Sequence, residues 1–386
     1  MALLTRKQLL LVKAEATYAT DSSPAGTDAL LVRSIDVTPL ESDVVSRELI
    51  RPWLGNNDQL LANQRVLINF QIELTGSGTA ATAPRFGALL KACGMAETTT
   101  ASAVTGSATA GAAGSITLAA GASATDDAYV GMIISITGGT GSGSSGVITD
   151  YVGSTKVATV QATTASFTPG ASSGYSIAAN VGYKPVSSSF GSVTIYYNND
   201  GVLHKATGCR GTFSLSAEVG AIPTIDFEFT GIYNAPTDTA APASTYTAQA
   251  DPLIFKPGNS STFSFLSYAG CLQSLSLDMA NELIYRELVG CTKEIMITNR
   301  APSGECMIEA VPIATKDYFA IANNDTTGVL TLLHGTTAGN RVSLVAPKVD
   351  ISNPTYADQD GVQMLNLPYV AIPTGAGNDE VSITFS

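Results

Sequence analysis

One short segment occurs twice in this chain of 386 residues. The first copy is Arg47-Glu48-Leu49-Ile50 and the second is Arg286-Glu287-Leu288-Val289. Their surroundings also correspond, since Ser34-Ile35-Asp36-Val37 precedes the first copy and Ser274-Leu275-Ser276-Leu277 precedes the second. Each copy is followed by an alternating strand pattern and then by a short helix-like stretch. Each copy of such a repeat must form the same supersecondary unit. We therefore expect one β-rich domain present in two copies.

The two copies differ in length, which indicates an insertion. Residues 204–215, beginning with His204, resemble residues 334–344, beginning with His334, so we expect the two histidines to be equivalent. The interval from Arg47 to His204 exceeds that from Arg286 to His334 by 109 residues. Residues 99–183, rich in Gly, Ser, Thr and Ala, account for most of this excess. The predicted organisation is an extended N-terminal arm (1–33), a first domain (34–98 plus 184–240), an inserted β module (99–183), a Pro-rich linker (241–264) and a second domain (265–386).

Charge and cysteine content exclude several classes of protein. The net charge is −12, which argues against a protein that grips duplex DNA, because that needs Lys and Arg to neutralise phosphate. Only 13% of the residues are charged, about half the usual share, which indicates surfaces that meet other protein. We expect no membrane span and no signal peptide, because the apolar start is broken by Arg6 and Lys7. The five widely spaced cysteines favour reduced thiols.

Local patterns place the main elements. Residues 66–74 alternate and predict a strand with Val66, Ile68, Phe70, Ile72 and Leu74 on one face. Residues 84–94 predict a short helix with one apolar face, opened by a Pro and stopped by a Gly. That face comprises Phe86, Leu89, Leu90 and Cys93. Residues 193–204 predict a hairpin with Asp200-Gly201 in its turn.

The stretch from Glu41 to Gln64 is too long for a tight turn, so we expect a protruding loop. It contains the only Trp of the chain, Trp53, beside Arg51 and Leu54. Trp and Arg are enriched at the energetic centres of protein interfaces, so the loop is a candidate contact between subunits. The alternative is that Trp53 covers the core of its own domain. We expect the N-terminal arm, with Tyr18, to pack on a neighbouring subunit.

No pattern indicates an enzyme, a metal site or a cofactor. Gly141-Ser-Gly143-Ser-Ser-Gly146 fits a dinucleotide-binding pattern, but a strand rather than a helix is expected to follow it. His204 and His334 lack further ligands at metal-binding spacing, so both are expected to be structural.

An ordered set of segments resembles the major tail tube proteins of phages with long, non-contractile tails (the siphovirus type). These segments are Ala14 to Asp21, Val37 to Leu40, Arg51 to Gly55, Glu73 to Gly78, Leu89 to Gly94, Ser192 to Tyr197, Gly201 to His204, Thr230 to Tyr233 and His334 to Asn340. The insert resembles small β modules that decorate phage virion proteins, through Ile116 to Ala119, Ala124 to Tyr129 and Thr155 to Val160.

This resemblance implies a mainly β fold of two tandem tail-tube-like β-sandwich or half-barrel domains, each with a short flanking α-helix, plus a small inserted all-β module. It also implies a structural virion protein, made in the host cytoplasm, that self-assembles into stacked rings around a channel for DNA. Tubes of this family usually have six domains per ring, so we expect trimeric rings with pseudo-sixfold symmetry, with hexameric rings as the alternative. Tape-measure and tail terminator or tip proteins are the expected partners. The candidate interface residues are Tyr18, Arg47, Glu48, Arg51, Trp53, Leu54, Arg286 and Glu287.

One expectation follows for the assembled form. Asp and Glu should dominate the strand positions that face the channel, because an acidic wall repels phosphate and lets DNA slide.

The first competing class is another virion β protein, either a head decoration or an adhesin-like carbohydrate-binding component. A glycan-degrading enzyme is a third class, but no paired carboxylates are recognisable. A contractile or secretion-system tube is a nearby variant that the duplication and the insert weigh against.

Overall fold

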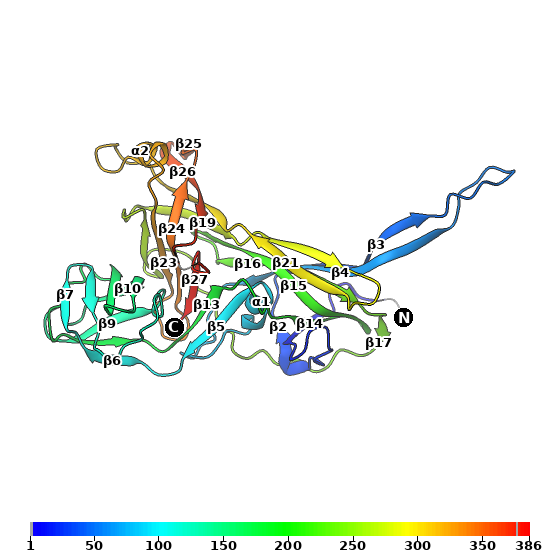
Figure 1. The fold of residues 1–386 in the computed structure, drawn as a ribbon, viewed down its shortest axis with the longest axis horizontal. Coiled ribbons are helices and arrows are strands. Elements are labelled where there is room, and N and C mark those ends of the chain that lie inside the picture. Colours follow the sequence, from blue (N-terminus) through cyan, green and yellow to red (C-terminus); the bar gives the residue numbers. More distant parts are fainter. Residues whose placement is uncertain (1–2, 376) are drawn as a thin grey trace.

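The computed structural model describes residues 3–375 and 377–386 and is mainly β, as expected (Figure 1). One 18-stranded sheet runs through the molecule, a 7-stranded sheet forms the insert, and two strands form a separate ribbon. Two short α-helices, α1 (Gly87–Ala92) and α2 (Tyr318–Asn323), flank the large sheet. None of the helices among these residues is long and apolar enough to cross a membrane.

The first half contains the expected strand and helix. The strands are β1 (Gln8–Ala14), β2 (Ala29–Leu30), β3 (Ser34–Ser46), β4 (Gln59–Glu73), β14 (Val193–Asn199), β15 (Val202–Glu218), β16 (Thr224–Tyr233) and β17 (Thr237–Asp238). The face of β4 predicted from alternation is buried, from Val66 to Leu74. The predicted apolar face of α1 is buried as well, which confirms the spacing argument. Asp200 and Gly201 both have positive φ in the β14–β15 turn, as the Asp-Gly pair predicts.

The segment expected to be an extended N-terminal arm is different in the structure. Residues 8–14 form β1, which pairs antiparallel with β14 along its whole length and with β2 at Leu10 and Leu11. Leu10, Leu11 and Val12 are buried. A run of apolar residues that can complete a sheet in its own chain has no need of a neighbouring subunit, so the expectation of an arm is wrong for this part.

The second half has its own strands and α2. They are β18 (Ser260–Phe265), β19 (Leu272–Asp278), β20 (Asn281–Arg286), β21 (Glu294–Arg300), β22 (Ser303–Glu309), β23 (Gly328–His334), β24 (Val342–Ile351), β25 (Thr355–Gln359), β26 (Val362–Ala371) and β27 (Ser382–Phe385). A long hairpin, a short helix, a second hairpin and a return strand follow one another in both halves. In the second half the long hairpin is divided by bends into β19–β20 and β21–β22.

Strand pairing makes the correspondence residue-specific. Along the large sheet β3 pairs with β4, β4 with β16 and β16 with β15, and in the second half β19 pairs with β22, β22 with β26 and β26 with β24 and β25. Ile35 pairs with Phe70 as Leu275 pairs with Cys306. The segments Ser34 to Val37 and Ser274 to Leu277, matched from sequence, therefore lie in the same register. This supports a duplicated unit.

The two histidines are not equivalent, contrary to expectation. His204 lies in β15, after the turn of its hairpin, whereas His334 ends β23, before the turn of the corresponding hairpin. Their sequence match was carried by turn residues. Buried His334 lies beside Ser260, with 2.9 Å between Nδ1 and Oγ, and its Nε2 lies 3.2 Å from the carbonyl oxygen of Leu253. These contacts fit the structural role that was predicted.

The two halves are joined edge to edge. Residues 214–218 of β15 pair antiparallel with residues 274–278 of β19, so the sheet of the first half continues into that of the second. One hydrophobic core extends beneath both halves. Loops add a second contact, because the Gly78 amide donates to the Gly339 carbonyl and the Gly76 amide donates to Asn340 Oδ1, at 3.0 and 2.8 Å.

The insert is docked on the second half. Its strands are β6 (Val104–Ser107), β7 (Ala110–Ala112), β8 (Ser115–Thr117), β9 (Ile133–Gly138), β10 (Ser145–Val152), β11 (Val157–Ala162) and β12 (Gly174–Ile177). The flanking strands β5 (Met95–Thr100) and β13 (Asn180–Pro185) pair with each other, and β13 also pairs with β27. Leu333 and Val345 of the second half are part of the insert's core. The insert is therefore held against β23 and β24 (Figure 1).

Candidate functional site

Among the described residues, no group of His, Cys, Asp or Glu is arranged to hold a metal ion. The Gly141 to Gly146 segment connects β9 and β10, so no helix follows it and the geometry of a dinucleotide site is missing. The features that stand out are instead open strand edges and exposed apolar side chains. These are the marks of a surface that meets other copies of a protein.

Two edge strands of the large sheet, β3 and β25, are equivalent to strands that are paired at the junction of the two halves. On one side β3 pairs with β4 alone, and on the other β25 pairs with β26 alone. The register shows what is missing there. Tyr356 in β25 occupies the position of Leu215 in β15, and it is 59% exposed whereas Leu215, covered by β19, is 2% exposed. A core-facing side chain is thus left uncovered at the end of the sheet.

The β3 edge shows the same deficit from the opposite side. Leu275 and Leu277 of β19 are each 1% exposed, because β15 covers them. Their equivalents Ile35 and Val37 in β3 remain only partly buried against the core. Leu31, just before this strand, is 46% exposed. Both ends of the sheet therefore lack the neighbour that each half provides for the other at their junction.

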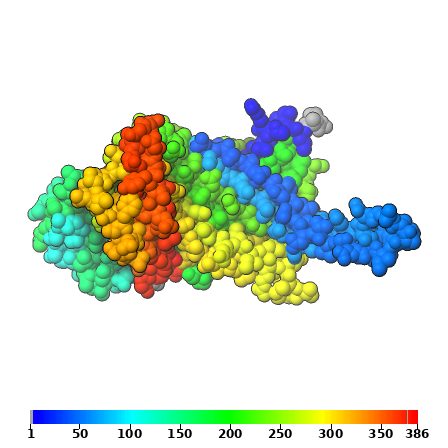
Figure 2. Space-filling model, turned by 90° about the horizontal axis from the view of Figure 1, so that it is seen from above, coloured from blue at the N-terminus to red at the C-terminus, as the bar shows by residue number. Residues whose placement is uncertain are grey.

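The stretch expected to be a protruding loop is a β-hairpin. Strands β3 and β4 extend beyond the body as a ribbon, and residues 47–58 form its tip (Figures 1 and 2). Ile50 and Leu54 are fully exposed at 102%, and Trp53 is 66% exposed. The alternative in which Trp53 covers its own core is therefore wrong. We call residues 47–58 the long tip.

Charged residues of the long tip are partly paired with one another. Arg47 Nη1 lies 3.2 Å and Arg51 Nη2 lies 4.0 Å from Asp58 Oδ2. Glu48 adopts a positive φ of 46° and forms no ion pair among the described residues. Exposed pairs of this kind contribute little to stability. The apolar side chains of the tip remain exposed beside them.

The second copy of the repeat forms a shorter tip, residues 287–293, between β20 and β21. Arg286 ends β20, and Glu287 pairs with Lys293 at 3.0 Å while accepting a hydrogen bond from Tyr285 at 2.8 Å. Val289 is fully exposed at 107%. We call residues 287–293 the short tip. The repeated Arg-Glu-Leu segments thus lie at corresponding hairpin ends.

Tyr18 is placed in a contact within the chain. Its hydroxyl accepts a hydrogen bond from the Ile295 amide at 2.6 Å, and the Arg210 guanidinium stacks over its ring, with Cζ 4.5 Å from the ring centre. Burial raises the pKa of Tyr18 to about 12. Arg210 is 8% exposed and forms an ion pair with Glu294 at 3.0 Å. This cluster anchors the start of β21, next to the short tip, to the first half.

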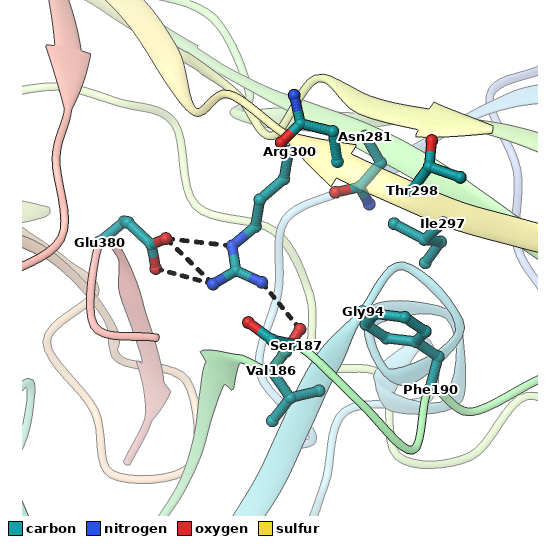
Figure 3. Close-up of a pocket in the computed structure, with 10 residues that line it drawn as sticks. Gly94, Val186, Ser187, Phe190, Asn281, Ile297, Thr298, Arg300 and Glu380 are labelled. Atoms are coloured by element: carbon teal, nitrogen blue, oxygen red, sulfur yellow. Dashed lines mark hydrogen bonds and ion pairs between the residues drawn. The ribbon is translucent and has the colours of Figure 1, made fainter. Parts of the chain in front are cut away.

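A second arginine, the half-buried Arg300, anchors the other end of β21 (Figure 3). Arg300 lies over a cavity of about 240 Å³ and binds Glu380 through Nε and Nη2, at 3.1 and 3.0 Å. Its Nη1 donates to the Val186 carbonyl at 2.7 Å. The structural roles of Arg210 and Arg300 were not predicted from the sequence. Neither has a local signal, because their partners lie 84 and 80 residues away.

Within the paired segments named below, the side of the large sheet that points away from the core carries acidic side chains and no basic ones, and Arg65 of β4 lies just beyond these segments. The outward positions of β3, β4, β16, β15, β19 and β22 in these segments are polar apart from Leu67 and Met307. Along residues 34–38, 67–73, 212–218, 224–230, 274–278 and 303–309 the sequence contains no Lys or Arg. The acidic side chains on this face are Asp36, Glu73, Glu218, Asp226, Glu228, Asp278, Glu305 and Glu309. The face is continuous because the six strands are paired in sequence across it.

Comparison with known proteins adds a family match. A family model described as phage tail tube protein matches residues 5–386, which is nearly the whole chain. No curated protein matches it.

Proposed function

Since the chain belongs to the phage tail tube protein family, we propose that it closes into rings of three copies that stack into the tube of the virion tail. Its role in that family is structural. The observation that carries the ring is the junction between the two halves. There β15 and β19 join two equivalent sheets edge to edge. The outer strands β25 and β3 are equivalent to β15 and β19, and their outer edges are unpaired.

Applying the internal junction between copies gives a defined register. Within the chain Leu215 pairs with Leu277 and Ser216 pairs with Ser276. Replacing each residue by its equivalent places Tyr356 of one copy opposite Val37 of the next, and Ala357 opposite Asp36. Such pairing covers Tyr356, Ile35 and Val37 and removes both open edges, as closure of a barrel does. With two units per chain, three copies supply the six domains that the resemblance implies for a ring.

The loop contacts of the junction have counterparts beside the two outer edges, β3 and β25. Inside the chain the loop after β4 meets the β23–β24 turn, through Gly78 and Gly339. The equivalent loop after β22 contains Ile313, which is 60% exposed, and the equivalent turn is Asp200-Gly201. We propose that these two segments meet across the boundary between copies. The ring contact then has the same two parts as the junction within the chain.

A disulfide experiment tests the ring and its size. Asp36→Cys with Ala357→Cys, in a chain with Cys271→Ser and Cys291→Ser, places thiols opposite each other on neighbouring copies. Directly opposed residues in antiparallel strands are about 4.5–5.5 Å apart, which a disulfide can bridge. On oxidation we expect covalent dimers and trimers in denaturing gels and no larger species.

The matched control moves one thiol along the same face. Asp36→Cys with Gln359→Cys is two residues out of register and should cross-link weakly, because the separation exceeds about 7 Å. Cross-linked species of up to six chains would show that the ring contains six copies and not three. No cross-link in assembled protein, or equal cross-linking by both pairs, would overturn the edge pairing.

The acidic face is the proposed channel wall. In the proposed ring this continuous face of the sheet points toward the channel. Its eight carboxylates repel the phosphates of a passing genome. Asp226→Lys with Glu228→Lys should leave ring formation intact and make tubes retain duplex DNA at low salt, with release as salt increases. Wild-type tubes that retain DNA equally well would contradict the assignment. Tape-measure and terminator or tip proteins remain proposed partners.

A further inference from the structure

An apolar groove lies at the end of the sheet opposite to the hairpin tips. It is lined by Val219, Phe255, Pro257, Phe263, Leu272 and Leu332, and it has a volume of about 390 Å³. Val219 follows the last residue of β15 and Leu272 is the first residue of β19, so the groove lies where β19 begins. The short tip follows Arg286, the last residue of β20, and therefore lies at the opposite end. We call this the junction groove, because residues from both halves line it.

We propose that the long tip of one copy docks in the junction groove of a copy in the adjoining ring. This inference rests on the proposed function, because it concerns how its rings stack. In a stack of identical rings one end of each ring meets the opposite end of the next. The tips leave the sheet at one end and the groove opens at the other, so the contact repeats without closing on itself, as a growing tube requires.

Size distinguishes this groove from its equivalent in the first half. A corresponding groove between β1 and the start of β3 is lined by Leu9, Leu10, Leu31, Val32 and Ile35 and measures about 170 Å³. The long tip presents Ile50, Trp53 and Leu54, whereas the short tip presents Leu288 and Val289. The larger apolar group matches the larger groove. Each copy thus offers one long tip and one junction groove, and the pairing fixes the rotation between rings.

Charge complementarity supports the same pairing. Glu48 on the long tip and Lys256 on the rim of the junction groove are both exposed. Neither forms an ion pair within the part of the chain that the structure describes. An acidic and a basic side chain beside two complementary apolar surfaces set the register of an interface.

A native cysteine permits a direct test. Cys271 is exposed and lines the junction groove, while Cys291 in the short tip is exposed at the other end. Leu54→Cys with Cys291→Ser should form disulfides between copies of adjoining rings, giving covalent chains longer than three copies. Adding Cys271→Ser should abolish them. The native chain, with Cys271 and Cys291 but no thiol at position 54, is the matched control and should not form this ladder.

Charge exchange gives a second, independent measurement. Glu48→Lys and Lys256→Glu should each raise the threshold concentration for tube growth about tenfold, and the double variant should restore it. Lys256→Glu with Glu287→Lys on the short tip should give no rescue. Tubes that assemble without the link between positions 54 and 271 and without this rescue overturn the groove assignment. Loss of the ring cross-link between positions 36 and 357 would instead overturn the proposed function.

Discussion

Substituting Trp53 by Ala removes the largest exposed apolar group of the long tip. A buried Trp side chain removes about 150–250 Å² from water, and 66% of Trp53 is exposed, so docking can bury roughly 150 Å² more. At about 25 cal/mol per Å² this is an upper value of about 4 kcal/mol per tip. Ordering costs on association reduce it, and we take about 2 kcal/mol as the net loss. That loss corresponds to roughly thirtyfold in the threshold concentration even if only one of the three tips per ring is counted.

The assay follows tube formation by sedimentation and electron microscopy across a concentration series. Because Trp53 is the only Trp of the chain, its fluorescence reports this tip alone, and wild-type emission should shift to shorter wavelength as rings stack. The variant's thermal unfolding and its ring cross-link should match those of wild type, since the tip lies outside the core. Trp53→Phe should fall between the two. Tubes of normal length at wild-type concentration, or Trp53 emission that stays solvent-like in assembled tubes, would refute the reasoning.

Three further predictions concern the single chain. Replacing residues 104–177 by a short linker uncovers Leu333 and Val345, so the free energy of unfolding in urea should fall by about 3–5 kcal/mol, and unchanged stability would show that the insert is not docked. Arg210→Ala leaves Glu294 and the Tyr18 ring without their buried cation and should lower the free energy of unfolding by about 3 kcal/mol, whereas Lys205→Ala, at an exposed pair with Asp21, should cost under about 1 kcal/mol in the same melts. Burial lowers the pKa of His334 below its ordinary 6.5, so the contribution of neutral His334 to the free energy of unfolding is complete above pH 6.5 and is lost as the pH falls below that value. His334→Gln should flatten this part of the curve of stability against pH. An equal slope in both proteins would exclude the histidine as its source.

Much of the local structure was readable from short-range pattern. The period of two placed Val66 to Leu74 on one buried face, and the spacing of Phe86, Leu89, Leu90 and Cys93 placed a helix. Asp200-Gly201 marked a hairpin turn through its backbone preference. These inferences depend on neighbours within a few residues. For the same reason, matched turn residues around His204 and His334 misled the alignment of strands.

Long-range partners explain the misses. The apolar run in β1 completes a sheet with β14, which lies about 185 residues further along the chain, so the run alone suggested a free arm. The ion pairs of Arg210 with Glu294 and of Arg300 with Glu380 likewise join distant segments. Composition predicted the insert, but not its docking through Leu333 and Val345, because those residues belong to strands of the other half.

The candidate site divides in the same way. The sequence by itself predicted the repeat and the positions of both tips, and it determined which side of each strand a residue faces, since alternation is set by the backbone of that strand. Only the tertiary structure decided that Trp53 projects into solvent, that Tyr18 is held within the chain, and that Ile35, Val37 and Tyr356 lie at uncovered edges. Which strand lies beside another depends on contacts between distant segments. The period of a single strand carries no record of its neighbour.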